Sequence, residues 1–285
     1  MSSKPVLEPV TPDLLPAFAA FLHQHLDASR SVDDWVRGFQ QPWMAEPPNH
    51  GFVVRVDGEI VGGIGALYAE REIDGQPVRT CNITSWCVLD AYRQQSMRLA
   101  MAVCQQPGYH FSDFSPTKVV AGTLQFLKFK PLPDGQWVMP NLPWVGGGRV
   151  LHRPEAIAQA LAAQPARARD HAMHRGFPWL HHLLLGSAEG GWCHVVYKRS
   201  TFKGLPTAVL LHASDRALLR RHWRRLSAHF LVRGLAWAKV DKRLMAEAPQ
   251  PAYLRTGFNP KLFLSATLRE DQVDLLYAEQ MALDL

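Results

Sequence analysis

The first half of the chain alternates apolar and polar residues with the two-residue period of β-strands, broken by short turns. Two such strands, over 52–56 and 60–66, flank Asp57-Gly58, a dipeptide typical of a two-residue hairpin turn. Asp74-Gly75 interrupts the next alternating stretch in the same way, before a strand that ends near Val88. We therefore expect a meander of antiparallel strands up to this residue.

Helical spacing of apolar residues is found before and after these strands. Residues 13–25 carry leucine and phenylalanine at intervals of three and four, which predicts an amphipathic helix. After Val88, a polar turn leads into a second helix near Ser96. A strand that enters a helix through such a turn directs backbone N–H groups and the positive end of the helix dipole at one point, which suits a phosphate. A strand over 109–114 follows, and then a helix with Ser115 as its expected N-cap.

The turn after Val88 resembles the acetyl-CoA-binding segment of the GNAT superfamily of acyl-CoA-dependent acyltransferases. That segment is a strand ending in Val, then a Pro-Glu-Tyr-Arg turn with three glycines in alternate positions, then a helix. Val88, Tyr92 and Arg93 match the family's Val, Tyr and Arg. The three glycine positions hold Gln94, Ser96 and Arg98, of which the last either blocks the approach of a diphosphate or contacts it. The resemblance covers residues 4–140.

This resemblance implies an acyl-CoA cofactor, acetyl-CoA or another, and a set of residues around it. The expected cofactor-binding residues are Trp86, Cys87, Val88, Arg93, Gln94, Gln95, Ser96, Met97 and Arg98. A general base is needed to take the acceptor's proton, and the catalytic candidates are His110, Asp113 and Ser85. The imidazole of His110 is the simplest choice because it titrates near neutral pH. Leu124 stands where many relatives carry a tyrosine that acts as general acid, so that role is unfilled or belongs to another residue.

The second half of the chain repeats the strand, strand, helix, strand order found around Val88. Strands are expected over 192–197, 207–212 and 235–240, with a helix over 215–233 between the last two. This order predicts a second, divergent GNAT-like unit. The expected fold is therefore mixed α/β (α+β), with two GNAT-like units in tandem. The expected boundaries are 1–135 for the acyl-CoA-binding domain, 136–165 for a linker and connecting helix, and 166–285 for the second domain.

Charge and reactive side chains limit the other function classes. The chain of 285 residues has a formal net charge of +6, and much of the excess lies in the helix over 215–233. Its arginines are expected on the solvated face, and no nucleic-acid motif accompanies them, so a nucleic-acid partner is not expected. Four scattered cysteines and a histidine group at 171–182 lack the spacing of a metal site, and the histidines are expected at the surface or at helix ends. No metal is predicted.

The sequence favours an enzyme that moves an acetyl or other acyl group from acyl-CoA to an amine or hydroxyl. The absence of a long apolar run or a secretion signal predicts a cytoplasmic protein without a membrane span. The acceptor is a small molecule or a glycan, and the resemblance to tandem GNAT-like proteins suggests surface-polysaccharide biosynthesis. The alternative is a noncatalytic GNAT-like binding module with a degenerate cofactor loop. N- versus O-acylation and the oligomeric state stay open.

Overall fold

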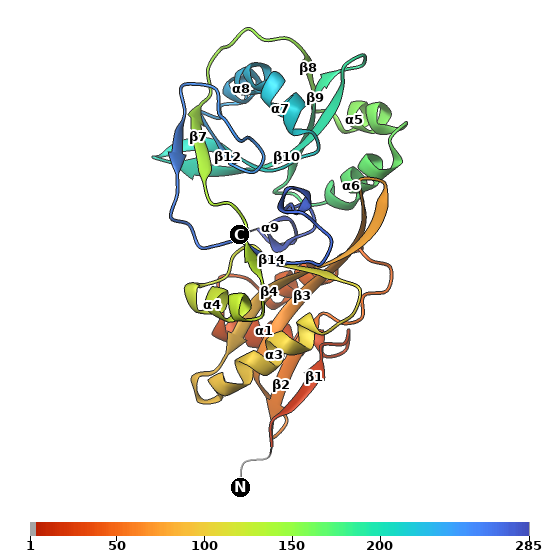
Figure 1. Cartoon of the computed structure of the whole chain (residues 1–285), viewed down its shortest axis with the longest axis vertical. Helices are drawn as coiled ribbons and strands as arrows, with labels where there is room; N and C mark the ends of the chain where they lie inside the picture. The colour runs from red at the N-terminus through yellow and green to blue at the C-terminus, as the bar shows by residue number, and fades with distance from the viewer. Residues whose placement is uncertain (1–3, 285) are drawn as a thin grey trace. The chain divides into compact units, whose positions relative to one another are not determined.

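The computed structural model describes residues 4–284, which divide into two compact units (Figure 1). Within the described residues, unit 1 comprises 4–132, 259–273 and 277–284, and unit 2 comprises 133–258 and 274–276. Residues 259–273 and 277–284, which lie within the expected second domain of 166–285, thus belong to unit 1. The segment 136–165, expected as a linker, forms strands and a helix of unit 2.

Unit 1 is built on a mixed sheet of seven strands. In spatial order these are β1 (Val6–Pro9), β2 (Gly51–Val56), β3 (Glu59–Ile73), β4 (Gln76–Val88), β5 (His110–Asp113), β14 (Leu262–Leu264) and β6 (Lys130–Pro131). Both predicted hairpins are present: Asp57 and Asp74 have φ of 52° and 51°, and each precedes a glycine of positive φ. Every neighbouring pair is antiparallel except β4 and β5, which run parallel.

Helices cover both faces of this sheet. On one face lie α1 (Leu15–His25) and α2 (Val32–Phe39), and on the other lie α3 (Ser96–Cys104) and α4 (Lys118–Phe126). A Cβ atom on Gly63 of β3 would lie 2.4 Å from the Phe18 ring of α1, so this glycine lets the helix lie directly on the strand. Its neighbour Ile64 points the other way, into a core shared with Leu99 and Leu124.

Helix α4 begins two residues later than expected. Its N-cap is Thr117, whose hydroxyl accepts a hydrogen bond from the Val120 amide. The prediction that Ser115 is the N-cap is therefore wrong, because the hydroxyl that accepts from an amide of the first turn belongs to Thr117. The Ser115 hydroxyl is left available for a contact elsewhere in unit 1.

Unit 2 has its own mixed sheet of seven strands. In spatial order these are β13 (Tyr253–Arg255), β7 (Gln136–Pro140), β12 (Trp237–Asp241), β11 (Leu205–Ala213), β10 (Gly191–Phe202), β9 (His181–Ser187) and β8 (Arg149–Leu151). Its helices are α5 (Pro154–Leu161), α6 (Pro165–His174), α7 (Arg216–Arg221) and α8 (Trp223–Val232). The single helix expected over 215–233 is thus divided at His222. Its predicted solvated face is confirmed, since Arg220, Arg221, Arg224 and Arg225 are exposed.

The two sheets follow the same plan. Counted from β1 in unit 1 and from β8 in unit 2, the fourth and fifth strands form the parallel pair in each sheet: β4 with β5 in unit 1, and β11 with β12 in unit 2. Helix α3 connects the first pair, and helices α7 and α8 connect the second. The sixth strand occupies different places in the sequence of the two units. In unit 1 it is β14, from the last part of the chain, and in unit 2 it is β7, the first strand of that unit in chain order.

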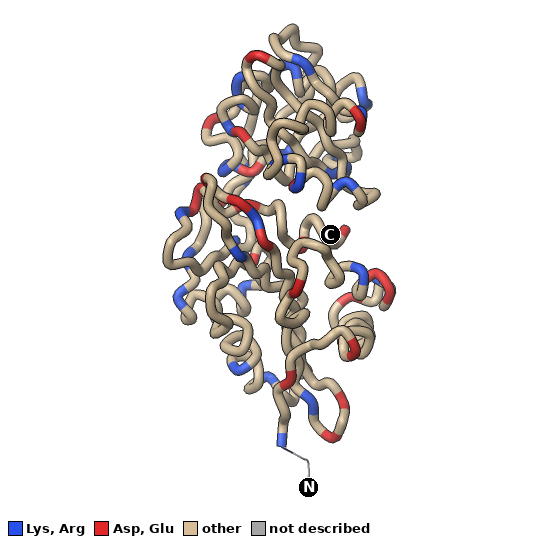
Figure 2. Tube along the Cα trace, turned by 90° about the vertical axis from the view of Figure 1, so that its right-hand side faces the viewer, with Lys and Arg blue, Asp and Glu red and all other residues tan. Residues whose placement is uncertain are grey.

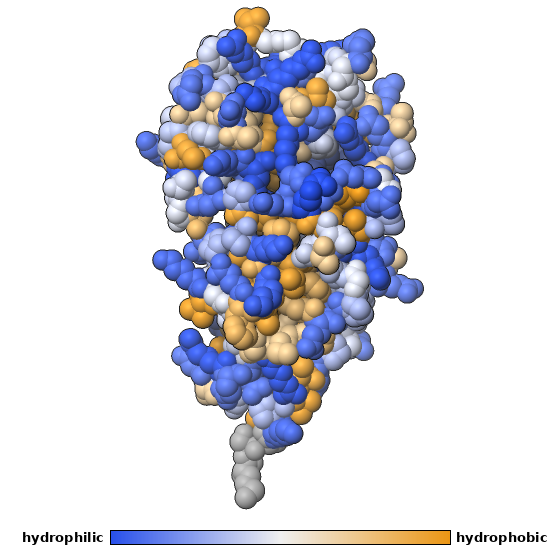
Figure 3. All heavy atoms as spheres, viewed as in Figure 1, coloured by the Kyte–Doolittle hydropathy of each residue, from blue (hydrophilic) through white to orange (hydrophobic). Residues whose placement is uncertain are grey.

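The surfaces of both units mix charges of either sign. Figure 2 shows lysine and arginine interspersed with aspartate and glutamate along the trace of each unit. In the view of Figure 3, hydrophilic residues cover most of unit 2, whereas apolar residues reach the surface in the middle of unit 1. No helix formed by residues 4–284 is long and apolar enough to cross a bilayer.

Candidate active site

Strands β4 and β5 separate soon after they pair. Their parallel ladder runs only from Thr80 opposite His110 to Asn82 opposite Ser112. Strand β4 continues to Val88, and among the described residues no strand pairs with its β5-facing edge beyond Asn82. An unpaired strand edge exposes backbone N–H and C=O groups that can bind an extended ligand as an added strand.

A β-bulge interrupts β4 in the region where the strands separate. Opposite β3, Thr84 pairs with Gly65 and Cys87 pairs with Gly63, so two residues of β4 face one residue of its partner. Ser85 is the first of these two residues and has φ of 51°, in the left-handed region. The bulge redirects the end of β4, and the Ser85 hydroxyl lies 3.2 Å from that of Thr84.

Two carboxyl groups are buried where β4 and β5 part. Asp113 ends β5, and Glu279 begins the short helix α9 (Glu279–Ala282) near the end of the chain. Ser115 connects them: its amide donates to Asp113 Oδ1 at 3.1 Å, and its hydroxyl donates to Glu279 Oε1 at 2.6 Å. The Glu279 amide in turn donates to Asn82 Oδ1 at 2.8 Å. The last part of the chain is thereby fixed to both strands.

Burial changes the acidity of this pair. Glu279 is fully buried, and burial raises its pKa to about 7 against hydrogen bonds from Ser115, Thr84 and Gln280, which lower it. Burial raises the pKa of Asp113 well above its ordinary range, and the nearby charge of Glu279 raises it further. Within residues 4–284, neither carboxyl forms an ion pair, and Glu279 Oε2 has no hydrogen-bond partner. This arrangement can accept a proton near neutral pH.

The segment between β4 and α3 is wound more tightly than an open loop. Residues Asp90–Gln95 form the 3₁₀-helix η1, in which the amides of Tyr92 and Ser96 donate to the carbonyls of Leu89 and Arg93. The amides expected to point at a diphosphate are therefore partly used within the turn. The Arg93 guanidinium donates to Asp90 Oδ1 at 2.9 Å, with both side chains exposed.

The remaining predicted cofactor-binding residues surround this turn. The side chains of Trp86 and Val88 pack on the core under β4, and Gln95, Ser96 and Met97 are half-buried, while Gln94 is exposed. Arg98 donates to the Pro5 carbonyl at 3.1 Å, so its guanidinium is held beside the N-terminal segment. Burial raises the pKa of the Cys87 thiol, which disfavours a nucleophilic thiolate there.

Comparison with solved structures identifies the architecture. A GCN5-related N-acetyltransferase from Anabaena variabilis superposes with a TM-score of 0.63 and 12% identity, over 91% of this chain and 72% of that one. A probable N-acyltransferase from Enterococcus faecalis gives 0.60 and 9%, over 92% and 72%. A tandem GNAT protein from the clavulanic acid biosynthesis pathway gives 0.53 and 13%, over 91% and 97%. No protein-family model and no curated protein sequence matches this sequence.

The chain has the GNAT fold. The match to a tandem GNAT protein along nearly its whole length agrees with the shared plan of the two sheets, so the predicted tandem arrangement is confirmed. In unit 1 the GNAT sheet places the separated strands β4 and β5, the bulge at Ser85 and the turn before α3 in one region.

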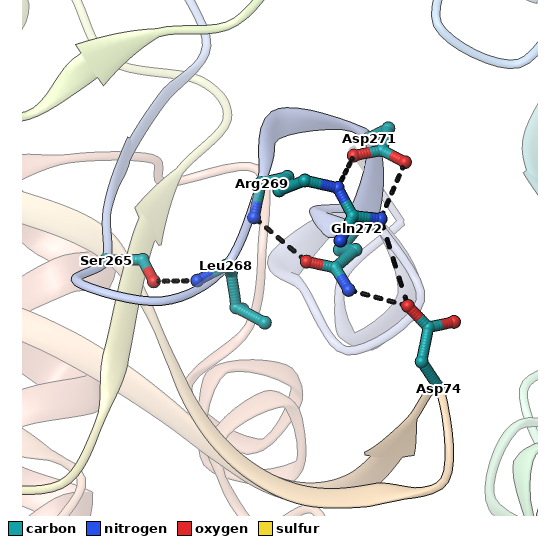
Figure 4. Close-up of polar contacts among 6 residues, drawn as sticks. All are labelled: Asp74, Ser265, Leu268, Arg269, Asp271 and Gln272. Carbon is teal, nitrogen blue, oxygen red and sulfur yellow. Dashed lines mark hydrogen bonds and ion pairs between the residues drawn. The ribbon is translucent and has the colours of Figure 1, made fainter.

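His110, the predicted base, lies at the start of β5, on the paired side of the separation. Its Nδ1 lies 2.8 Å from the Ser265 hydroxyl, and burial lowers its pKa. Figure 4 shows the surroundings of that serine, whose oxygen accepts from the Leu268 amide. Beyond it, Gln272 donates to Asp74 at the tip of the β3–β4 hairpin at 2.7 Å. These contacts give the imidazole a structural partner and hold segment 259–273 against the GNAT sheet.

The site also contains residues outside the predicted catalytic set of His110, Asp113 and Ser85. Glu279, Ser115 and Asn82 meet Asp113 where the strands part. The isolated Glu279-Gln280 pair in an otherwise apolar C-terminal stretch was the one available signal for a buried acid. Nothing local in the sequence connects it to β5.

The histidines of unit 2 form a separate buried group. His182 Nδ1 lies 3.1 Å from His194 Nε2, with the rings stacked at 5.3 Å, and His171 packs on both. His171 and His174 lie in the last turn of α6, one of the two expected placements, but both are buried, so the expectation of a surface position is wrong for them. Among residues 4–284, no group of three or more His, Cys, Asp or Glu side chains is placed to hold a metal ion.

Proposed function

We propose that this chain is an acyl-CoA-dependent acyltransferase that uses the separated strands of unit 1 to hold its cofactor. The observation that carries the proposal is the GNAT sheet in which β4 leaves β5 after Asn82 and keeps an unpaired edge to Val88. Acyl-CoA would supply the acyl group as a thioester. The amide groups of its extended arm fit the backbone donors and acceptors along that edge. A backbone N–H near Val88 is the expected donor to the thioester oxygen.

The diphosphate part of the cofactor would face the turn before α3. The Arg93 side chain is 70% exposed and its partner Asp90 is 86% exposed. An ion pair this exposed is worth at most about 1 kcal/mol, so a diphosphate can replace the carboxylate as the partner of Arg93. Gln94 is exposed beside it, and Ser96 adds a hydroxyl at the start of the helix. These side chains would thus replace some of the hydrogen bonds to the diphosphate that the turn cannot donate, because several of its amides are already bonded within η1.

Calorimetric titration of the full chain with acetyl-CoA tests this proposal, together with an assay for released CoA thiol. Micromolar binding and thiol release would support an acyltransferase. Longer acyl-CoA esters in the same titration would define the acyl group. The absence of both binding and release with every acyl-CoA would contradict the proposal.

A noncatalytic binding module is the second candidate. The observation that favours it is η1, which uses amides that an open phosphate loop would leave free, at positions where Gln94 and Ser96 replace glycines. This candidate predicts no heat of binding with acetyl-CoA. The same titration therefore separates the two functions.

The proposal names a chemical class of acceptor and not a particular molecule. Either an amine or a hydroxyl of a small molecule or glycan is consistent with a proton acceptor beside the separated strands. Surface-polysaccharide biosynthesis and a cytoplasmic location stay predictions. Mass spectrometry of products from a panel of amines, amino sugars and alcohols, incubated with acetyl-CoA, would show whether nitrogen or oxygen is acylated.

A further inference from the structure

The acid pair is placed where a proton must leave the reacting groups. Glu279 lies where β4 and β5 part, because its amide bonds Asn82 of β4 and its carboxylate bonds Ser115, just after β5. The last paired residues of the two strands are Asn82 and Ser112. A group bound along the unpaired edge of β4 would therefore approach Glu279 from the open side of the separation.

Ser115 connects this buried carboxylate to the surface. Ser115 is exposed whereas Glu279 is fully buried, and the hydrogen bond of 2.6 Å between them is short. The serine is not the N-cap of α4, so its hydroxyl has no competing role in that helix. A hydroxyl can accept one proton while it donates another, which makes it a suitable relay.

We propose that Glu279 is the final acceptor of the proton released by the acyl acceptor, and that the Ser115 hydroxyl relays it. This inference rests on the proposed function. The acceptor's nitrogen or oxygen forms a bond to the thioester carbonyl carbon, and its proton moves to Ser115 Oγ as the serine proton moves to Glu279 Oε1. The carbon–sulfur bond then breaks. The departing thiolate takes the proton back along the same path, which yields CoA thiol and restores the Glu279 carboxylate.

Asp113 disfavours a second negative charge beside Glu279. Two carboxylates held by one serine in a buried site repel each other, so ionisation of one opposes ionisation of the other. Glu279 Oε1 accepts from both the Ser115 hydroxyl and the Gln280 side-chain amide, whereas Asp113 accepts from the Ser115 amide, so the ionised form is better stabilised on Glu279. Its unpartnered Oε2 leaves it without the full set of hydrogen bonds that would make it a weak base.

The test measures thiol release from acetyl-CoA by the full chain, with ethanolamine as acceptor and water as the competing acceptor, between about pH 5 and pH 9. A proton acceptor contributes about 100-fold or more, so Glu279→Gln should lower kcat by at least about 100-fold. The variant should bind acetyl-CoA as the parent does. Once the rates are divided by the fraction of unprotonated ethanolamine at each pH, the remaining acidic limb of the parent's profile should disappear in the variant, a change that a purely structural glutamate would not cause.

Two further variants make the relay itself testable. Ser115→Ala should lower kcat by about 10-fold or more, and Ser115→Thr, which keeps the hydroxyl, should restore most of it. Glu270→Gln, an exposed acid of the 3₁₀-helix η2 (Glu270–Gln272), is the matched control and should leave the rate unchanged.

Each negative result has a distinct meaning. Unchanged rates and pH profile in Glu279→Gln would overturn this inference while leaving the proposed function in place. Equal losses in Ser115→Ala and Ser115→Thr would overturn the relay. No binding and no release by the parent chain would overturn the proposed function, and this inference with it.

Discussion

The hydroxyl of Ser115 and the carboxylate of Glu279 form a 2.6 Å hydrogen bond between positions 164 residues apart in the chain. This contact makes the last helix part of unit 1, and it places an acid beside the strands that define the candidate site. The same segment supplies β14 to the sheet of unit 1. The first GNAT unit is therefore completed by residues that follow the second one along the chain.

Replacing Glu279 by Gln should stabilise unit 1 at alkaline pH. Burial raises the folded-state pKa of Glu279 to about 7 from an ordinary value of 4.5, so the folded state binds this proton more tightly than the unfolded state. Its contribution to stability is present below about pH 4.5 and is lost as pH rises through about 7. The variant, which cannot ionise, should gain on the order of 2 kcal/mol in the free energy of unfolding at about pH 8.

Urea unfolding at about pH 8 and pH 4, followed by hydrogen exchange in unit 1, measures this difference. The two proteins should have nearly equal stability at the lower pH. Glu270→Gln should show no gain at either pH, because that side chain is exposed. A Glu279→Gln variant that is less stable than the parent at pH 8 would mean that the hydrogen bond to Ser115 outweighs the burial of the charge.

The two arginines near the turn before α3 should have unequal effects on acetyl-CoA affinity. Arg93 is exposed and pairs with the exposed Asp90, so it can turn to a diphosphate, whereas Arg98 is bonded to the Pro5 carbonyl. Arg93→Ala should weaken acetyl-CoA binding by about 10-fold, which is the affinity that one charge-assisted hydrogen bond contributes. Arg98→Ala should weaken it by less than about 2-fold. Calorimetry on both variants decides this, and a larger loss with Arg98→Ala would place that guanidinium at the cofactor.

The sequence was sufficient for features that depend on local chemistry. Asp57-Gly58 and Asp74-Gly75 specify their hairpins because aspartate and glycine tolerate positive φ, and alternation defines the strands between them. The match of Val88, Tyr92 and Arg93 to a GNAT segment pointed to the fold that the structure confirms. The repeated strand and helix order after residue 190 likewise indicated the second unit.

What the sequence could not reveal depends on contacts between distant segments. Neither β14 nor Glu279 carries a motif, and each finds its place by completing a sheet edge or a buried hydrogen bond. Ser115-Pro116-Thr117 offers two possible N-caps; Thr117 caps α4, and the Ser115 hydroxyl instead bonds Glu279, which is distant in the sequence. The histidines at 171–182 resemble surface residues by their polarity, yet β9 and α6 enclose them together with His194 of β10.

Introducing a side chain at Gly63 should destabilise unit 1. An alanine Cβ there would lie 2.4 Å from the buried Phe18 ring and 3.2 Å from Val53, so α1 must move away from β3. Overpacking of this kind costs about 1–3 kcal/mol. Gly122→Ala is the control: nothing lies within 4 Å of its Cβ position in α4, and alanine should gain up to about 1 kcal/mol there. Thermal unfolding of both variants should show shifts of opposite sign.

The buried histidines should make unit 2 lose stability as pH falls. Burial lowers the folded-state pKa of His174 to about 4 and of His182 to about 3, from an ordinary value of 6.5. The unfolded chain therefore takes up protons below about pH 6.5 that the folded unit does not, so stability is full above that pH and declines as it is lowered. Between about pH 7 and pH 5, each of these two should cost roughly 2 kcal/mol.

Hydrogen exchange in unit 2 measures the free energy of unfolding across this pH range. The slope of that free energy against pH gives the number of protons taken up on unfolding. His182→Gln should reduce the slope by about one proton, whereas His25→Gln, at an exposed position in unit 1, should not change it. The stability of unit 1 should instead rise as pH falls over the same range, because its buried acid pair binds protons more tightly in the folded state than in the unfolded state. A unit 2 that is equally stable at pH 7 and pH 5 would show that the imidazoles gain solvent or partners in solution that offset their burial.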